Sequence, residues 1–257
     1  MSGPDGSRTG GGTIGTGPRA ATALRVTQRS TQPGHDHVHG YGVMGIPLSS
    51  GDYLALRCWT TSSIGPAYRS VWHRDPDGRW TIYADQPPEV SCARFVGAAA
   101  HEVVTAPIRL DWSGDHHLDI EVADLRWEID LVSSPATIAL TGGGSLPPEP
   151  AWASPVVLRL MGRLAGPLLG TGPLRLMGVM PCGQTYRMAA RRTWLVRDTR
   201  AEDAGHPLGH QCRPDAPITI GPVVLPLRGV FFADATGRFT VPAPRGTAQG
   251  RGTLRSR

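Results

Sequence analysis

Lysine is missing from this chain, and all 26 residues that count as Lys or Arg are arginines. A lysine Schiff base, a pyridoxal phosphate anchor and a phosphate-loop lysine are therefore excluded. The sequence also lacks the Gly-x-Ser-x-Gly and His-Glu-x-x-His patterns of serine hydrolases and zinc proteases. No cofactor is expected, and spacing alone identifies no catalytic nucleophile.

Cysteines and long apolar runs are also scarce. Four widely spaced cysteines without a Cys-x-x-Cys pair are typical of reduced thiols in a cytoplasmic protein (Cys58, Cys92, Cys182 and Cys212). No stretch reaches the ~18 apolar residues of a membrane span, and residues 1–33 contain no apolar signal-peptide core. We expect a cytoplasmic protein without a membrane span, whose oligomeric state the sequence leaves open.

The formal net charge of +5 does not indicate nucleic-acid binding, because much of it lies at the two ends of the chain. Residues 1–33 and 242–257 are rich in glycine, proline and arginine, which predicts a disordered leader and a disordered basic tail. Residues 34–241 then form a single β-barrel-like domain. Arginines in these two stretches include Arg8, Arg19, Arg245, Arg251, Arg255 and Arg257.

The clearest structural pattern is a β-hairpin over residues 70–83. Its turn, Asp-Pro-Asp-Gly at 75–78, places proline where φ is preset and Gly78 where φ can be positive. The predicted register pairs Arg74 with Trp80 and Trp72 with Ile82. Alternation then gives two partly apolar faces, one with Trp72, Trp80 and Ile82 and the other with Val71, His73, Thr81 and Tyr83.

Most of the remaining apolar pattern also has the period of two that is typical of β-strands. A second Pro-x-Gly turn at 181–183, with Cys182 as a turn residue, joins residues 174–180 to 184–188. The glycine triplets at 10–12 and 142–144 are interpreted as linker or loop. Further strands are predicted at 53–59, 108–112, 118–122, 125–131, 192–196 and 223–232.

One segment has helical periodicity. Ser154 and Pro155 form an N-terminal signal, residues 156–165 carry a wide apolar stripe, and Gly166 with Pro167 should end the helix. This helix either packs on the sheet or lies at a membrane surface or ligand entrance. The predicted fold is mainly β, an antiparallel lipocalin-like barrel or curved sandwich with one short helix near 155–165.

Several histidine patterns resemble metal sites. His35, His37 and His39 would share one face of a strand, although an exposed polar stretch next to the leader explains them equally well. Neither the pair at 116–117 nor the pair at 206 and 210 has good chelating geometry. No metal is assigned, and metal binding by the first group is left open.

The hairpin supplies the candidate site residues. If the face with His73 and Tyr83 lines the interior, these two side chains form a titratable pair suited to acid–base chemistry. If the other face does, Trp72 and Trp80 line it, with Arg74 stacked over Trp80. Structurally, the tryptophans could instead be core and His73 solvent-facing. Candidate catalytic acids are His73 and Asp111.

The sequences of residues 70–80, 172–178 and 181–184 resemble a family of uncharacterised actinobacterial β-rich proteins over about residues 41–232. Cys182 stands where that family is expected to have asparagine. The architecture also resembles, more distantly, lipocalin-like proteins, including the carotenoid hydratase-like group. That resemblance implies a barrel around an apolar ligand and transfers no catalytic residue.

The expected function is the binding of an apolar small molecule, such as a lipid, isoprenoid or polyketide, in a barrel interior. The alternative is an enzyme acting on such a ligand, a hydratase, isomerase or cyclase using acid–base catalysis. A second alternative is an interaction module with a filled core. A cavity inside the fold would argue against the interaction module with a filled core. A carboxylate or imidazole that faces this cavity would favour the enzyme over the binding protein.

Overall fold

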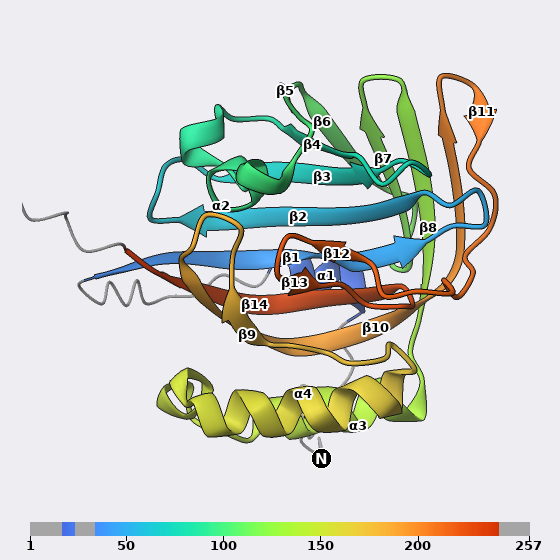
Figure 1. Ribbon diagram of the computed structural model, residues 1–257. Helices are drawn as coiled ribbons and strands as arrows, with labels where there is room; N and C mark the ends of the chain where they lie inside the picture. Colours follow the sequence, from blue (N-terminus) through green and yellow to red (C-terminus); the bar gives the residue numbers. More distant parts are fainter. Residues whose placement is uncertain (1–16, 24–33, 242–257) are drawn as a thin grey trace, which may run out of the picture.

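The computed structural model describes residues 17–23 and 34–241. Its main feature is a strongly curled sheet with strand order β5-β4-β3-β2-β1-β14-β10-β8-β7-β6 (Figure 1). Short strands β9 and β11 add to β10, and β12 pairs with β13 separately. The strands are β1 His35–Pro47, β2 Tyr53–Ser62, β3 Tyr68–Arg74, β4 Trp80–Ala84, β5 Glu102–Thr105, β6 Ile108–Trp112, β7 His117–Val122, β8 Leu125–Val132, β9 Met177–Val179, β10 Thr185–Asp203, β11 His206–Pro207, β12 Thr219–Ile220, β13 Val223–Val224 and β14 Val230–Thr240.

The predicted hairpin is confirmed as β3 and β4, with Arg74 opposite Trp80 and Trp72 opposite Ile82. Gly78 has φ +89°, as the turn requires. The meander is confirmed as β6, β7 and β8, and the second Pro-x-Gly turn joins β9 to β10. Strand β10 spans 19 residues and is much longer than the predicted strand at 192–196.

The two faces of the sheet belong to different cores. We call the face that carries Val71, Leu54 and Trp127 the inner face, because the curl of the sheet brings β6–β8 and β1–β3 together around it. We call the face that carries Trp72 and Trp80 the outer face; α2 and β13 cover part of it. Each large apolar side chain buried in either core stabilises the fold by ~1.5–3 kcal/mol.

The mainly β class is confirmed, but the sheet is a mixed half-barrel and not a closed antiparallel barrel. Strands β4 and β5 pair in parallel. The edge strands β5 and β6 follow one another in the chain, separated by residues 106–107, and do not pair within the described residues. Pro107 lies between them and has no N–H to donate to a sheet ladder.

More helices occur than the single one predicted. They are α1 Pro18–Thr22, α2 Ala93–Val96, α3 Pro135–Ser145 and α4 Pro155–Leu169, with 3-10 turns η1 Pro88–Val90, η2 Gly97–Ala99 and η3 Glu149–Ala153. None of the described helices is long and apolar enough to cross a membrane.

The predicted end of the helix at Gly166 and Pro167 is wrong. Helix α4 begins at Pro155 as predicted but continues to Leu169. A proline this near the end removes one hydrogen bond of the last turn and leaves the rest intact. The helix ends at Gly170, whose φ of +67° allows the Thr171 amide to donate to the Gly166 carbonyl.

The interpretation of residues 142–144 as a loop is also wrong, since they lie in α3. A capping box begins that helix: the Ser134 hydroxyl accepts from the Thr137 amide, and the Thr137 hydroxyl accepts from the Ser134 amide. Gly144 is needed for packing, because a Cβ there would lie 2.8 Å from the Arg191 carbonyl oxygen of β10.

Within the stretch predicted as a disordered leader, α1 is described and its Ala21 is buried in the inner core. The Arg19 amide donates to the Asp115 carbonyl, which joins α1 to the loop before β7. The rest of that leader and the predicted basic tail at 242–257 lie outside the described residues.

Candidate functional site: an unpaired arginine in an apolar cavity

A small apolar cavity lies on the outer face of the sheet. Its volume is about 80 Å³. It is enclosed by β2, β3, β10 and β14 on the sheet side and by α2 and β13 on the other. The lining residues are Arg57, Trp59, Trp72, Cys92, Phe95, Val96, Met180, Tyr186, Met188, Val223, Leu225 and Phe239.

Arg57 is the charged residue of this lining. Its Nη1 donates to the carbonyl oxygens of Val43 at 2.5 Å and Leu56 at 2.9 Å, and its Nη2 donates to that of Met44 at 3.2 Å. These bonds use three of the five N–H donors of a guanidinium group. The remaining two have no hydrogen-bond partner among the described residues.

The rest of the Arg57 environment is aromatic. The guanidinium carbon lies 4.7 Å from the centre of the Trp72 ring and 5.5 Å from that of Phe232. No carboxylate of the described part of the chain forms an ion pair with Arg57. Desolvation by burial lowers the pKa of Arg57. A cation that is partly removed from water and has no counter-ion would stabilise an anion that enters this cavity.

The backbone of β1 explains how the arginine is held. Gly42 lies opposite Arg57, and a Cβ at Gly42 would approach the Leu56 carbonyl oxygen to 2.1 Å. The pairing of β1 with β2 shifts register between Val43 and Ile46. Such a bulge interrupts the ladder and exposes main-chain carbonyls. Two of them, on Val43 and Met44, accept from the Arg57 side chain.

The remaining polar groups of the cavity are poorly suited to catalysis. The lining contains no aspartate, glutamate or histidine. Burial raises the pKa of the Cys92 thiol, whose Sγ lies 3.8 Å from the Tyr68 hydroxyl, so the thiolate is disfavoured. The Tyr186 hydroxyl donates to the Arg175 carbonyl. The cavity can therefore hold an anion but offers no general base.

The structure separates the residues predicted for the site. Trp72 lines the cavity, while Trp80 is buried in the same core and its Nε1 donates to the Thr219 carbonyl at 3.0 Å. Arg74 contacts the Asp75 carbonyl at 3.4 Å. No cation–π contact of Arg74 with Trp80 occurs among the described residues.

His73 and Tyr83 lie on the inner face, away from the cavity. His73 is not solvent-facing: it is 8% exposed, and its Nε2 lies 2.7 Å from Oδ1 of the buried Asp52. Tyr83 packs against the inner core, and burial raises the pKa of its hydroxyl. Asp111 is exposed on the edge strand β6 and faces Asp119 of β7.

The histidines of β1 are not one exposed polar stretch. His39 is buried, and its Nε2 lies 3.1 Å from Asp234 Oδ1, which Arg191 Nη1 approaches at 3.3 Å. His35 and His37 are half-buried, with ring centres 6.3 Å apart. The His39 contact lowers the pKa of Asp234, so His39 Nε2 is engaged within the fold.

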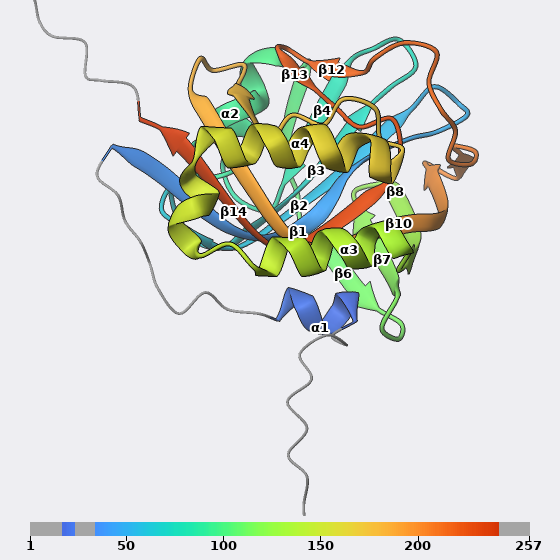
Figure 2. The ribbon, with the colours of Figure 1, turned by 90° about the horizontal axis from the view of Figure 1, so that it is seen from below.

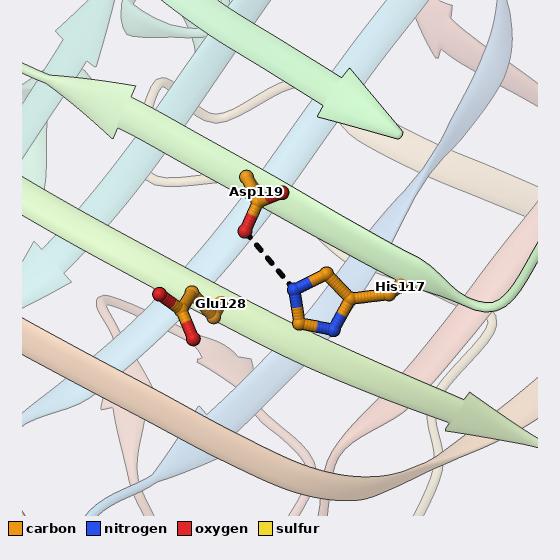
Figure 3. A group of neighbouring side chains, drawn as sticks. All are labelled: His117, Asp119 and Glu128. Atoms are coloured by element: carbon orange, nitrogen blue, oxygen red, sulfur yellow. Dashed lines mark hydrogen bonds and ion pairs between the residues drawn. The ribbon is translucent and has the colours of Figure 1, made fainter. Parts of the chain in front are cut away.

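A different group has the donor set of a metal site. His117, Asp119 and Glu128 place one ligand atom each within 4.8 Å of the others on neighbouring strands β7 and β8 (Figure 3). His117 Nδ1 lies 2.9 Å from Asp130 and its Nε2 lies 3.1 Å from Asp119. Hydrogen bonding to Asp130 raises the pKa of His117, which favours the imidazolium ion over the neutral ligand form. Two carboxylate contacts therefore account for both ring nitrogens of His117, and Glu128 is exposed beside them.

Sequence reasoning missed Arg57, because it is one arginine within an otherwise ordinary strand pattern at 53–59. The available signal was the group of three closely spaced glycines at 40, 42 and 45 in the preceding strand. Glycine inside a strand marks a bulge or a close approach of another group.

No protein-family model and no curated protein matches the chain. Two solved structures resemble it distantly. An acetoacetate decarboxylase from Legionella pneumophila shares 8% identity, with 80% of this chain and 82% of that chain covered and a TM-score of 0.35. An acetoacetate decarboxylase-like enzyme from Sphingomonas wittichii shares 11% identity, with coverage of 81% and 91% and a TM-score of 0.34. These likenesses are too weak to transfer a site or an activity.

Proposed function

We propose that this protein binds a small organic anion in the outer-face cavity. The anionic group, such as a carboxylate, would bind Arg57, and a short apolar body would contact Trp72, Phe95 and Phe239. The observation that carries the proposal is a half-buried arginine that lines an apolar cavity, with two free N–H donors and no acidic partner among the described residues. Guanidinium groups bind carboxylates with paired hydrogen bonds.

The cavity volume limits the size of the ligand. Pockets for drug-sized molecules measure ~300–1,000 Å³, whereas one water needs ~10–15 Å³ of the same kind of space. At about 80 Å³, this cavity suits a ligand of a few carbon atoms. A lipid, isoprenoid or polyketide would require the cavity to enlarge, so a short-chain acid is the better candidate within the apolar class.

An enzyme remains a less favoured alternative. Acid–base catalysis at this cavity would need a carboxylate or imidazole in its lining, and the lining has neither. A reaction through a lysine Schiff base is excluded because the chain has no lysine. Binding is therefore the function that the geometry supports best.

A thermal-shift series tests the proposal. Straight-chain carboxylates of two to eight carbons are compared with the amides of the same lengths on the full chain. At a concentration 100-fold above Kd, a bound ligand adds ~2.7 kcal/mol of stability, or ~5–10 °C in Tm for a chain of this size. We expect shifts for acids of intermediate length and none for amides.

Arg57→Gln is the decisive variant, since glutamine retains a donor for the β1 carbonyls but has no charge. Its unliganded circular dichroism spectrum checks the fold. Loss of the acid-dependent shift in a folded Arg57→Gln protein supports the proposal. Equal shifts with acids and amides, or no shift with any acid, would contradict it.

A further inference from the structure

Helices α3 and α4 form a layer on one side of the molecule. They lie side by side beneath β10, and the view from below shows both at the surface of that side (Figures 1 and 2). We call residues 135–169 the helix layer. Its inner side packs Ala165, Leu169 and Leu158 against the sheet and η3.

The opposite side of the layer exposes aliphatic side chains. Four of them recur every fourth residue along α4, so they form one stripe, and each is at least half exposed. Six of the eight large hydrophobic side chains that are exposed in the described part of the chain belong to this layer. They are Val156, Leu160, Leu164 and Leu168 on α4, Ile138 on α3, and Leu146 just after it.

Arginines border this stripe. Arg159 and Arg163 are exposed one turn apart on α4, next to the apolar side chains. With Arg175 they line an open groove of about 650 Å³ between α4 and residues 172–177. None of the three forms an ion pair with a described residue. Glu149 is the single acidic residue in the sequence from 135 to 177.

We infer that the helix layer binds the surface of a membrane that contains anionic phospholipids. The leucines and valine of α4 would enter the boundary between headgroups and acyl chains, and the arginines would bind lipid phosphates, with the groove large enough for a headgroup. An interfacial helix combines these two elements, an apolar stripe and flanking basic residues. This surface is separate from the Arg57 cavity.

Two other occupants fit the layer less well. A symmetric pair of copies would bring the same patch against itself and place unpaired arginines opposite arginines. Hot spots of protein–protein interfaces are poor in leucine and valine, and the stripe on α4 consists of leucines and a valine. Charge and side-chain chemistry together favour an anionic lipid surface.

Vesicle co-sedimentation of the full chain tests the inference. We expect binding to vesicles of phosphatidylcholine with 30% phosphatidylglycerol and at least ~10-fold weaker binding to phosphatidylcholine alone. The double variant Arg159→Glu, Arg163→Glu should reduce binding to anionic vesicles by ~30-fold or more. The variant Leu160→Ser, Leu164→Ser keeps every charge and should also lose binding, with an unchanged circular dichroism spectrum.

The matched control is Arg200→Glu, Arg213→Glu, which changes the net charge equally at exposed positions outside the layer. It should bind like the unmodified chain. Equal losses in both charge-reversal variants would mean that net charge alone drives binding and would overturn the inference. So would retained binding by the leucine variant, no binding to either vesicle, or a dimer in sedimentation velocity that depends on Leu160 and Leu164.

Discussion

On the inner face of the sheet, the buried His73 lies 2.7 Å from the buried carboxylate of Asp52. On the outer face, the half-buried Arg57 has no carboxylate partner among the described residues. Both arrangements place a polar group inside the fold. The inner pair is satisfied within the protein. The outer group retains free donors beside a cavity, so it is available to a ligand.

The largest expected effect on the free energy of unfolding comes from replacing one buried tryptophan on each face of the sheet. Trp127 is fully buried in the inner core, and its Nε1 donates to Thr199 Oγ1 at 2.8 Å. Trp127→Ala should lower the free energy of unfolding by ~3–5 kcal/mol. Trp72→Ala should lower it by less, about 1–3 kcal/mol, because Trp72 already borders empty space. Urea denaturation measures both values, and equal losses would show that Trp72 is ordinary core.

Breaking the inner pair should have the next largest effect. His73→Leu leaves the Asp52 carboxylate buried without its partner, at a cost of ~3 kcal/mol. It should leave carboxylate binding unchanged, since His73 lies on the other face. Chemical denaturation and ligand titration of the same variant separate the two results. A stable variant that no longer binds ligand would show that His73 belongs to the site.

The β3–β4 turn provides a smaller effect that depends on neither core. Gly78 has φ +89°, where a β-branched residue is strained. Gly78→Val should cost ~1–3 kcal/mol, and Gly78→Asn should be milder. Thermal unfolding of both variants measures the difference. If the two variants are equally stable, Gly78 does not need its positive φ, and the turn does not determine the register that places Trp72 on the outer face.

The smallest effect concerns pH and the ion pairs of His117. Hydrogen bonding to Asp130 raises the pKa of His117 in the folded protein. The stability that His117 contributes is therefore fully present below the pKa of the unfolded chain, ~6.5, and is lost as pH rises through the pKa of the folded state. His117→Gln should therefore destabilise the protein more at pH 5.5 than at pH 8.5, by under ~1 kcal/mol for these half-exposed groups. A larger loss at pH 8.5 would indicate a neutral imidazole with another role.

The features that short-range chemistry controls could be predicted from the sequence. The turn at 75–78 determines its own register, so the division of Trp72 and His73 between two faces follows from four consecutive residues. The meander likewise follows from alternation within each strand. Helix α3 was missed because its glycine triplet is typical of loops, and the capping box at Ser134 and Thr137 is evident only in the structure.

The site could not be predicted in the same way, because it depends on distant segments. Arg57 becomes unusual only when Cys92, Met180 and Phe239 enclose it and when a bulge in β1 presents carbonyls to its side chain. Those contacts span about 180 residues of sequence. From the sequence alone, the aromatic residues of a hairpin are predicted as candidate site residues, whereas a single arginine in a strand is not.

The most direct test of the account is isothermal titration calorimetry with pentanoate and pentanamide, which match in length and differ in charge. The account predicts that the unmodified chain and the exposed-arginine control Arg69→Gln bind pentanoate and not pentanamide, and that folded Arg57→Gln binds neither. Pentanoate binding that persists in Arg57→Gln would contradict the central claim that the unpaired arginine of the outer face is the ligand's partner.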